Sequence, residues 1–296
     1  MNAPPSGSAC PSVAVAFGGG GARGLAHVHV IEALDELGVR PAAIAGSSIG
    51  AIMGAGMAAG MTGRDIADHA RSVLSDRRQV AARVWRSRPM PPGERETGGV
   101  GLTLFHIERL LKAFLPPAIP ATFEELSIPL KVTATDFFGH ELVALETGDL
   151  PEALAASSAI PAVFRPVRRD GRLLIDGGIL NPVPFDLVRA RADIVLAVDV
   201  VGAPSPKAKG RLSPLDLALG ASQLMMGAIT AAKLREGAPA VLVRPAVSGF
   251  RVLDFWNIEA VLSETAPVKE RAKRALDEAI AAWRPDAGRS AALRLA

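Results

Sequence analysis

The sequence predicts an α/β fold in which a mostly parallel sheet is covered by helices on both faces. Short apolar runs alternate along the chain with longer segments of helical periodicity, and glycine-rich turns follow several of these runs, as expected where parallel strands lead into helices. The chain has 296 residues, of which 49% are hydrophobic and 21% charged. This composition is typical of a globular protein with a sizeable core.

Composition also limits the range of possible functions. The net charge of +3 is too small to indicate nucleic-acid binding. Cys10 is the single cysteine, which excludes an intramolecular disulfide and a thiolate metal site. Residues 1–12 are rich in Pro, Ser and Gly and predict a disordered tail and not a signal peptide. We expect one domain over residues 13–290 and a second tail over 291–296. We also expect a cytoplasmic protein that can associate peripherally with a membrane.

The first strand, residues 13–17, leads directly into the glycine-rich loop 18–24 and a helix over 25–37. Free N–H groups and the helix dipole would make this loop an anion site. Its glycines Gly19, Gly21 and Gly24 also fit the G-x-G-x-x-G dinucleotide fingerprint. That alternative needs an acidic residue at the end of the next strand, and the strand over 39–45 is followed by Gly46 and Ser47. An oxyanion hole therefore fits this loop better than a cofactor site.

The second strand ends in a Gly-x-Ser-x-Gly pattern formed by Gly46, Ser48 and Gly50. In such a turn the serine is held in a strained conformation that exposes its hydroxyl, and larger residues at the glycine positions would collide. The alternative is a turn of small residues that lets a helix pack closely on a strand. Residues 41–63 lack charged side chains, and we expect the helix over 51–61 to be a buried helix and not a membrane span.

The remaining elements continue the alternation of strands and helices. In the middle of the chain we expect a helix from 62 to 75, an amphipathic helix over 102–115, a hairpin of strands over 128–137 and 141–145, and a helix over 149–156. Residues 77–97 carry six arginines, which is typical of a solvated loop or of a flap that meets anionic lipid headgroups. The C-terminal part predicts strands over 173–175, 194–200 and 241–243, a loop over 201–211, and helices over 185–191, 214–235 and 259–283.

A serine nucleophile needs a base. The order Ser–Asp–His of α/β-hydrolases cannot be built with Asp176, because every histidine precedes it: these are His27, His29, His69, His106 and His140. A pair formed by Asp136 and His140 would place both residues on one hairpin, which makes it a minor alternative. A Ser48–Asp176 dyad is the other solution, since Asp176 follows a buried strand and precedes two glycines. Asp176 could instead cap its own turn.

Four blocks of this sequence resemble those of the patatin-like phospholipase family, in the bacterial branch that is similar to the esterase domain of neuropathy target esterase. The blocks are GGGGARG at 18–24, GSSIG at 46–50, ASSAIPAVF at 156–164, and DGG at 176–178 followed by NPVP at 181–184. The resemblance covers about residues 13–200. Gly18 stands where plant members often have an acidic residue, which we interpret as a difference between branches.

The resemblance implies a three-layer α/β/α fold and hydrolysis of lipid acyl esters without a cofactor or catalytic metal. Ser48 would be the nucleophile and Asp176 the base. The N–H groups of Gly19, Gly20 and Gly21 would bind the oxyanion, with Arg23 steadying their loop; the other motif glycines are Gly24, Gly46, Gly50, Gly177 and Gly178. A catalytically weak module that binds lipid or protein is the alternative function. Headgroup, acyl length and oligomeric state are not predicted.

Overall fold

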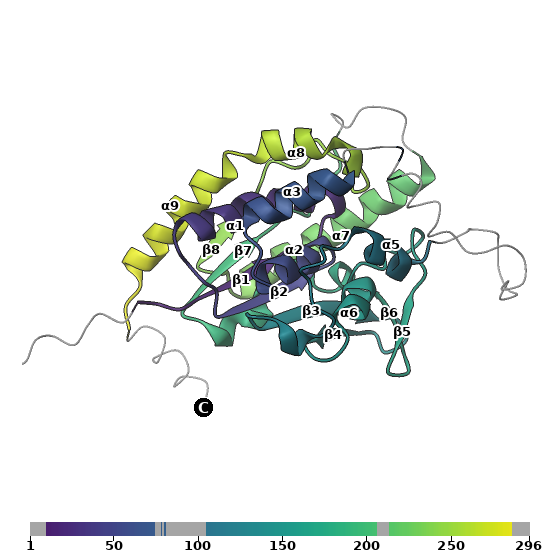
Figure 1. Ribbon diagram of the computed structural model, residues 1–296, viewed down its shortest axis with the longest axis horizontal. Helices are drawn as coiled ribbons and strands as arrows, with labels where there is room; N and C mark the ends of the chain where they lie inside the picture. The colour runs from purple at the N-terminus through teal and green to yellow at the C-terminus, as the bar shows by residue number, and fades with distance from the viewer. Residues whose placement is uncertain (1–9, 75–77, 79, 81–104, 206–212, 286–296) are drawn as a thin grey trace, which may run out of the picture.

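The computed structural model describes residues 10–74, 78, 80, 105–205 and 213–285 (Figure 1). Most of the predicted flap at 77–97 and of the loop at 201–211 lies outside these residues, as do nearly all of the two predicted tails.

One sheet of eight strands forms the centre of the described structure. The strands are β1 (Val13–Phe17), β2 (Ala43–Ser47), β3 (Leu130–Asp136), β4 (Glu141–Leu145), β5 (Val167–Arg169), β6 (Arg172–Asp176), β7 (Ile194–Val198) and β8 (Val241–Val243). Their order is β5-β6-β3-β2-β1-β7-β8, and β4 pairs with β3 outside this path. The pairs β1–β2, β1–β7, β2–β3 and β7–β8 are parallel, whereas β3–β4, β3–β6 and β5–β6 are antiparallel. The predicted mostly parallel sheet is confirmed.

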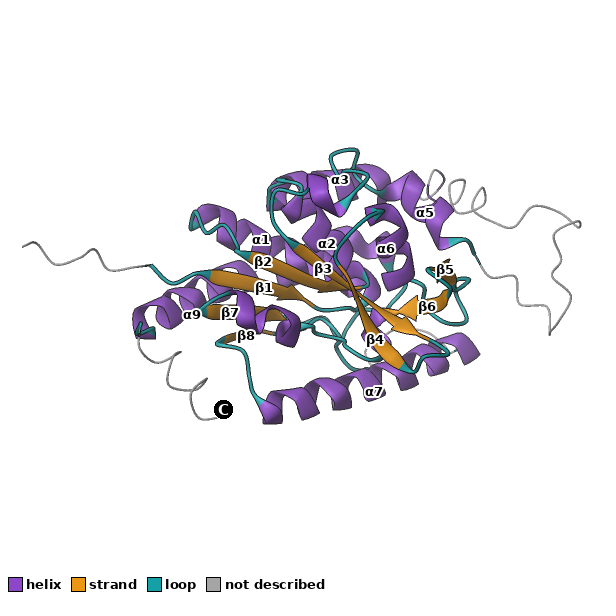
Figure 2. Ribbon diagram, turned by 90° about the horizontal axis from the view of Figure 1, so that it is seen from below, coloured by secondary structure: helices purple, strands orange, loops and turns teal. Residues whose placement is uncertain are grey.

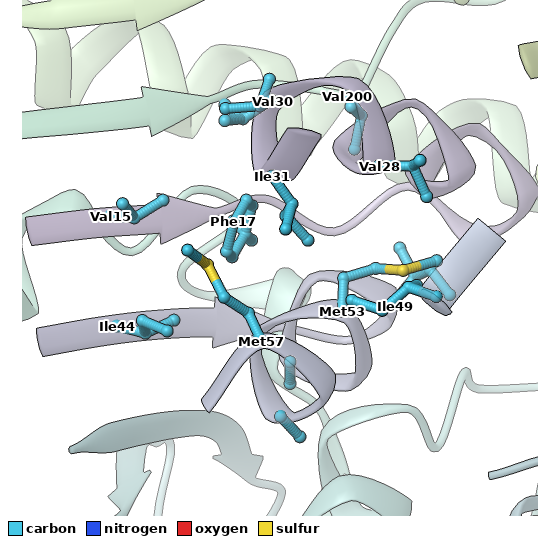
Figure 3. Packing of buried hydrophobic residues seen from close by; sticks show 14 of the residues in the cluster. Val15, Phe17, Val28, Val30, Ile31, Ile44, Ile49, Met53, Met57 and Val200 are labelled. Carbon is cyan, nitrogen blue, oxygen red and sulfur yellow. The ribbon is translucent and has the colours of Figure 1, made fainter. Parts of the chain in front are cut away.

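The larger hydrophobic core lies on one face of the sheet. Val13, Val15 and Phe17 of β1 point into it because alternate residues of a strand face opposite sides. Figure 3 shows Phe17 among side chains of the neighbouring helices. The helices that contribute to this core are α1 (His27–Glu36), α2 (Ile49–Ala58), α3 (Gly63–Leu74), α5 (Ile107–Phe114), α6 (Leu150–Ser157), α8 (Ile258–Thr265) and α9 (Val268–Ala282).

The opposite face of the sheet is covered by the 3-10 helix η4 (Phe185–Arg191) and by α7 (Pro214–Glu236). The strand residues on this face are small, among them Ala14 and Ala16, so these elements approach the sheet closely. Figure 2 shows α7 on the side of the sheet away from α1, α2 and α3, which confirms the predicted three layers. By length and composition alone α7 could cross a membrane, and only 11% of its most apolar window is buried.

The structure corrects three details of the predicted elements. The expected helix over 259–283 is two helices, α8 and α9, because Pro267 has no N–H to continue the hydrogen-bond ladder. The expected helix over 25–37 starts as a 3-10 turn, η1 (Gly21–Ala26), before α1. The strand β5 was not predicted, since its three residues are too short for a periodic signal.

Candidate active site

Ser48 lies in the sharp turn between β2 and α2. Its backbone has φ 53° and ψ −124°, a region that residues with a side chain rarely adopt. A Cβ on Gly46 would lie 2.4 Å from the Cα of Ala51, and one on Gly50 would lie 2.2 Å from the carbonyl oxygen of Phe17. The strained turn and the steric need for both glycines are therefore confirmed. The N–H of Ser48 donates a 2.8 Å hydrogen bond to Ser157 Oγ, which fixes the turn against α6.

Asp176 is the last residue of β6. This strand pairs with β3, and β3 in turn pairs with β2, the strand that leads into Ser48. The Ser48 hydroxyl donates a 2.6 Å hydrogen bond to Asp176 Oδ2. The other carboxylate oxygen, Oδ1, accepts a 2.7 Å hydrogen bond from the N–H of Gly178. A Cβ on Gly177 would come within 2.2 Å of Thr133 Oγ1, so this tight turn needs glycine there. The structure brings together the two residues that the sequence nominated as a dyad.

Burial changes the acidity of Asp176. Loss of solvent raises the pKa of this carboxyl from an ordinary 3.8 to about 6, although the hydrogen bonds from Ser48 and Gly178 oppose the rise. At pH 7 the group is thus mainly ionised and is a stronger base than an exposed aspartate. A carboxylate with these properties can accept the proton of a bound hydroxyl.

The glycine loop after β1 lies beside the dyad, and one prediction about it is wrong. Gly19 cannot offer its N–H to an oxyanion because this group already donates a 2.8 Å hydrogen bond to the carbonyl oxygen of Pro182. The N–H groups of Gly20 and Gly21 have no hydrogen-bond partner within the described part of the chain. Both glycines line a cavity with Ser48 and Asp176. Of the three glycines predicted to form the oxyanion hole, Gly20 and Gly21 therefore keep N–H groups without a partner in the described structure.

Arg23 contacts the segments on either side of the glycine loop. Its Nε donates a 2.8 Å hydrogen bond to the carbonyl oxygen of Phe250, and its guanidinium also donates to the carbonyl oxygen of Val201. Burial lowers the pKa of Arg23 to about 10, and the nearby charge of Asp254 counteracts this effect. Such contacts suit the predicted role of Arg23 in holding the loop in place, and this role stays a prediction.

His27 is a supporting residue to which the sequence analysis gave no role at the site. The ring is fully buried, and Nε2 lies 2.8 Å from the carbonyl oxygen of Gly18, at the start of the glycine loop. Burial lowers the pKa of His27 to about 4, so the ring is neutral at pH 7 and Nε2 carries the proton donated to Gly18. Ser157 is the second residue that was missed; it stands in the ASSAIPAVF block, but only the tertiary structure shows its bond to Ser48.

The other histidines have partners or positions away from Ser48. His29 Nε2 lies 2.9 Å from the carbonyl oxygen of Leu262, and His69 Nε2 lies 2.8 Å from that of Phe114. His106 precedes α5, and His140 lies in the turn between β3 and β4. In that turn the N–H groups of residues 138 and 139 donate to Asp136, so the minor alternative pair of Asp136 and His140 does not reach the serine.

Two cavities of the described structure open on Ser48. The larger has a volume of about 380 Å³ and a lining that is almost wholly apolar, contributed by α2, α3, α5 and residues such as Phe164 and Trp256. The smaller, of about 180 Å³, is lined by Gly20, Gly21, Asp176 and residues of α7. Ser48 thus lies between an apolar cavity and a more polar one. Within the described residues, no group of three or more His, Cys, Asp or Glu side chains could hold a metal ion.

The comparisons with known proteins agree with this geometry. The family model described as patatin-like phospholipase matches residues 15–189. An uncharacterized NTE family protein of Mycobacterium tuberculosis is 38% identical over 204 residues, which cover 69% of this chain and 53% of the relative. Patatin-like phospholipase domain-containing protein 6 of Mus musculus is 31% identical over 196 residues, or 64% of this chain and 13% of that protein.

Among solved structures, VipD from Legionella pneumophila aligns with a TM-score of 0.50 and 17% identity, over 92% of this chain and 68% of that one. This structural similarity shows that the chain and VipD share a fold. The chain spans about half the length of the mycobacterial relatives that it matches. The matched model covers more than half of the sequence and includes the loop, the serine and the aspartate described above. The chain therefore belongs to the patatin-like phospholipase family.

Proposed function

We propose that the chain is a serine hydrolase that cleaves acyl esters of lipids through an acyl-enzyme on Ser48. The observation that carries the proposal is the 2.6 Å hydrogen bond from the Ser48 hydroxyl to the buried carboxylate of Asp176. The apolar cavity on one side of Ser48 supports a lipid substrate, because it has the lining and volume that an acyl chain needs. The family name supports the same class of substrate.

In the first half of the reaction, Asp176 Oδ2 accepts the hydroxyl proton while Ser48 Oγ bonds to the ester carbonyl carbon. The carbonyl oxygen becomes an oxyanion, and the free N–H groups of Gly20 and Gly21 are the donors that would stabilise it. When the tetrahedral intermediate collapses, the bond to the alcohol oxygen breaks. Asp176 returns its proton to that oxygen, so the alcohol leaves neutral and Ser48 carries the acyl group.

In the second half, Asp176 accepts a proton from a water molecule whose oxygen attacks the acyl carbon. The second tetrahedral intermediate expels Ser48 Oγ, which takes the proton back from Asp176, and the fatty acid leaves. Both halves use one base, and its raised pKa of about 6 suits both proton transfers near neutral pH.

A fluorophosphonate probe tests the nucleophile directly, because it forms a covalent bond only with an activated serine. We expect labelling of Ser48 and hydrolysis of p-nitrophenyl esters, with both lost in Ser48→Ala. The neighbouring Ser47 is a matched control: it is buried, and its hydroxyl has no hydrogen-bond partner in the described structure. Ser47→Ala should keep both signals. Absence of both signals from the wild type would favour the alternative of a binding module, whereas probe attachment elsewhere or normal turnover by Ser48→Ala would show that Ser48 is not the nucleophile.

We also propose that the protein works in the cytoplasm at the surface of a lipid phase. Outward-facing side chains of α7, namely Leu217, Leu224 and Met225, are exposed although they are large and apolar. The same helix borders the smaller cavity at Ser48. A lipid surface against this face would therefore lie on the outer side of the helix that borders the cavity.

A further inference from the structure

The apolar cavity follows one side of α2 away from the nucleophile. The residues of this helix that line it are Ile49, Ile52, Met53 and Gly56. Their spacing places them on one face of α2, which begins directly after Ser48. A chain that is attached to Ser48 Oγ and enters this cavity therefore runs along the helix. The helix itself gives a scale for the length of that chain, because each residue advances the axis by about 1.5 Å.

Helix α3 packs on α2 at the far end of this path. A Cβ on Gly56 would lie only 3.1 Å from Cδ1 of Ile66 in α3, so the two helices are in close contact at this glycine. The same side of α3 contributes Ile66, Ala70 and Val73 to the lining of the cavity. Gly56 is eight residues beyond Ser48, which corresponds to about 12 Å along α2. The path from the nucleophile to the contact between the helices has this length.

Helix α5 meets α3 near the same end of the cavity. His69 Nε2 of α3 lies 2.8 Å from the carbonyl oxygen of Phe114, the last residue of α5, and both residues line the cavity. His69 comes about one turn after Ile66, so the contact of α3 with α5 lies beside its contact with α2. The three helices therefore come together at the level of Gly56.

The length of this path corresponds to an acyl chain of medium length. A fully extended chain of single bonds advances by about 1.2 Å per bond, which is the value for an extended protein backbone. A path of about 12 Å thus holds about ten carbons beyond Ser48 Oγ. Ile52 lies at half of this depth, since it is four residues beyond Ser48. Its side chain is half-buried and forms part of the cavity wall.

We propose that the acyl chain of the substrate lies along α2 and that the protein prefers esters of medium-chain fatty acids, of about ten carbons. Ile52 and Met53 are then residues that determine the specificity for chain length. This inference rests on the proposed function and adds to it the chemical class of the acyl group.

The test is the profile of kcat/KM over p-nitrophenyl butyrate, decanoate, myristate and palmitate, each at the same mole fraction in the same detergent micelles. In the wild type we expect kcat/KM to rise from butyrate to decanoate, because each methylene that the cavity buries contributes a factor of about four. It should fall again for palmitate, whose chain is longer than the path. A higher kcat/KM for palmitate than for decanoate would overturn the proposed length.

Two variants change the cavity in opposite directions. Ile52→Trp places a larger side chain halfway along the path, so the ratio of decanoate to butyrate kcat/KM should fall at least about 100-fold as about four methylenes lose their place. Met53→Ala removes about three heavy atoms from the wall, and the ratio of myristate to decanoate kcat/KM should rise about threefold to tenfold. Ratios within one protein are independent of the amount of folded protein in each preparation.

Met57→Ala is the matched control for Met53→Ala. The two methionines are buried to a similar extent in α2, with 4% of Met53 and 6% of Met57 exposed, but Met57 does not line the cavity. Figure 3 shows the two side chains pointing in different directions from the helix. Met57→Ala should keep the wild-type ratios.

Two further results would overturn the inference. One is the same change of ratio in Met57→Ala as in Met53→Ala, which would show a general loosening of the core. The other is a set of wild-type ratios in both Ile52→Trp and Met53→Ala. All of these outcomes leave hydrolysis of p-nitrophenyl butyrate by the wild type intact, whereas failure of the proposed function would abolish hydrolysis of every ester.

Discussion

Replacing Asp176 by asparagine should destroy activity and at the same time stabilise the fold. Burial raises the pKa of the carboxyl from an ordinary 3.8 to about 6. At about 1.4 kcal/mol per pKa unit, the ionised group costs the folded state about 3 kcal/mol. Asparagine keeps the shape and can still accept from Gly178 and meet the hydroxyl of Ser48, but it carries no charge. We expect Asp176→Asn to lose at least about 100-fold in kcat/KM and to gain up to about 3 kcal/mol in unfolding free energy.

The gain in unfolding free energy of Asp176→Asn must depend on pH. Below pH 3.8 the carboxyl is protonated in both the folded and the unfolded chain, so the variant and the wild type should be equally stable. The cost of ionising Asp176 in the folded state grows as the pH rises from 3.8 to 6 and is complete above 6. Urea unfolding followed by circular dichroism at pH 4, close to the lower limit, and at pH 8, above the upper one, measures this change.

At each pH the quantity to compare is the difference in unfolding free energy between Asp176→Asn and the wild type. The reason is that His27 makes both proteins less stable as the pH falls, whereas the cost of ionising Asp176 makes the wild type less stable as the pH rises. The pKa of His27 falls from 6.5 to about 4 in the folded state, so the unfolded chain binds a proton first as the pH drops. Stability from His27 is present above pH 6.5 and is lost as the pH falls to 4. This effect is common to the variant and the wild type and cancels in the difference.

Two results would refute this reasoning. An Asp176→Asn protein that is no more stable than the wild type at pH 8, or whose gain is the same at pH 4 and pH 8, would show that the carboxylate is not destabilised by burial. Retained hydrolysis would show that Asp176 is not the base. Asp136→Asn offers a control for activity, since Asp136 is also a buried carboxylate of the sheet but binds the N–H groups of its own hairpin.

The remaining predictions concern pH, the serine turn and the lipid surface. In the wild type, kcat/KM should fall about tenfold per pH unit below pH 6, because protonated Asp176 cannot act as a base; a flat profile down to pH 5 would contradict this role. Ser157→Ala should lower the unfolding free energy by about 1–3 kcal/mol, since it leaves the buried N–H of Ser48 without an acceptor; urea unfolding that matches the wild type would argue against it. Leu217→Ser combined with Leu224→Ser should weaken sedimentation with lipid vesicles at least about tenfold, because both exposed side chains would otherwise be buried in lipid. Hydrolysis of soluble p-nitrophenyl butyrate should stay the same, and unchanged vesicle binding would exclude this face as the contact.

The sequence was sufficient for the features that depend on local rules. The alternation of apolar runs and helical segments predicted the layers, and the glycines around Ser48 predicted a turn whose crowding the structure confirms. Asp176 was nominated because it follows a buried strand and lies before two glycines. The break at Pro267 was also readable from the sequence, but we gave the helical periodicity over 259–283 more weight than the missing N–H of proline.

Contacts between distant segments could not be predicted in this way. Gly19 has the same local pattern as Gly20, and only the return of the chain at Pro182 shows that its N–H is occupied. The contact of α7 with the site gave no signal either, because this helix is apolar on all sides and its sequence does not reveal which face meets the sheet. Both features depend on how the segments after Asp176 fold back over the site.

The position of α7 links the strength of the base to the choice of substrate. Desolvation is the largest cause of the raised pKa of Asp176, and Met226 of α7 packs on the turn that holds this residue. The same helix supplies one wall of the smaller cavity. A leaving group that fills this cavity would exclude more water from the carboxylate and raise its basicity further. Binding of a leaving group that fits this cavity would thus strengthen the base that activates the serine.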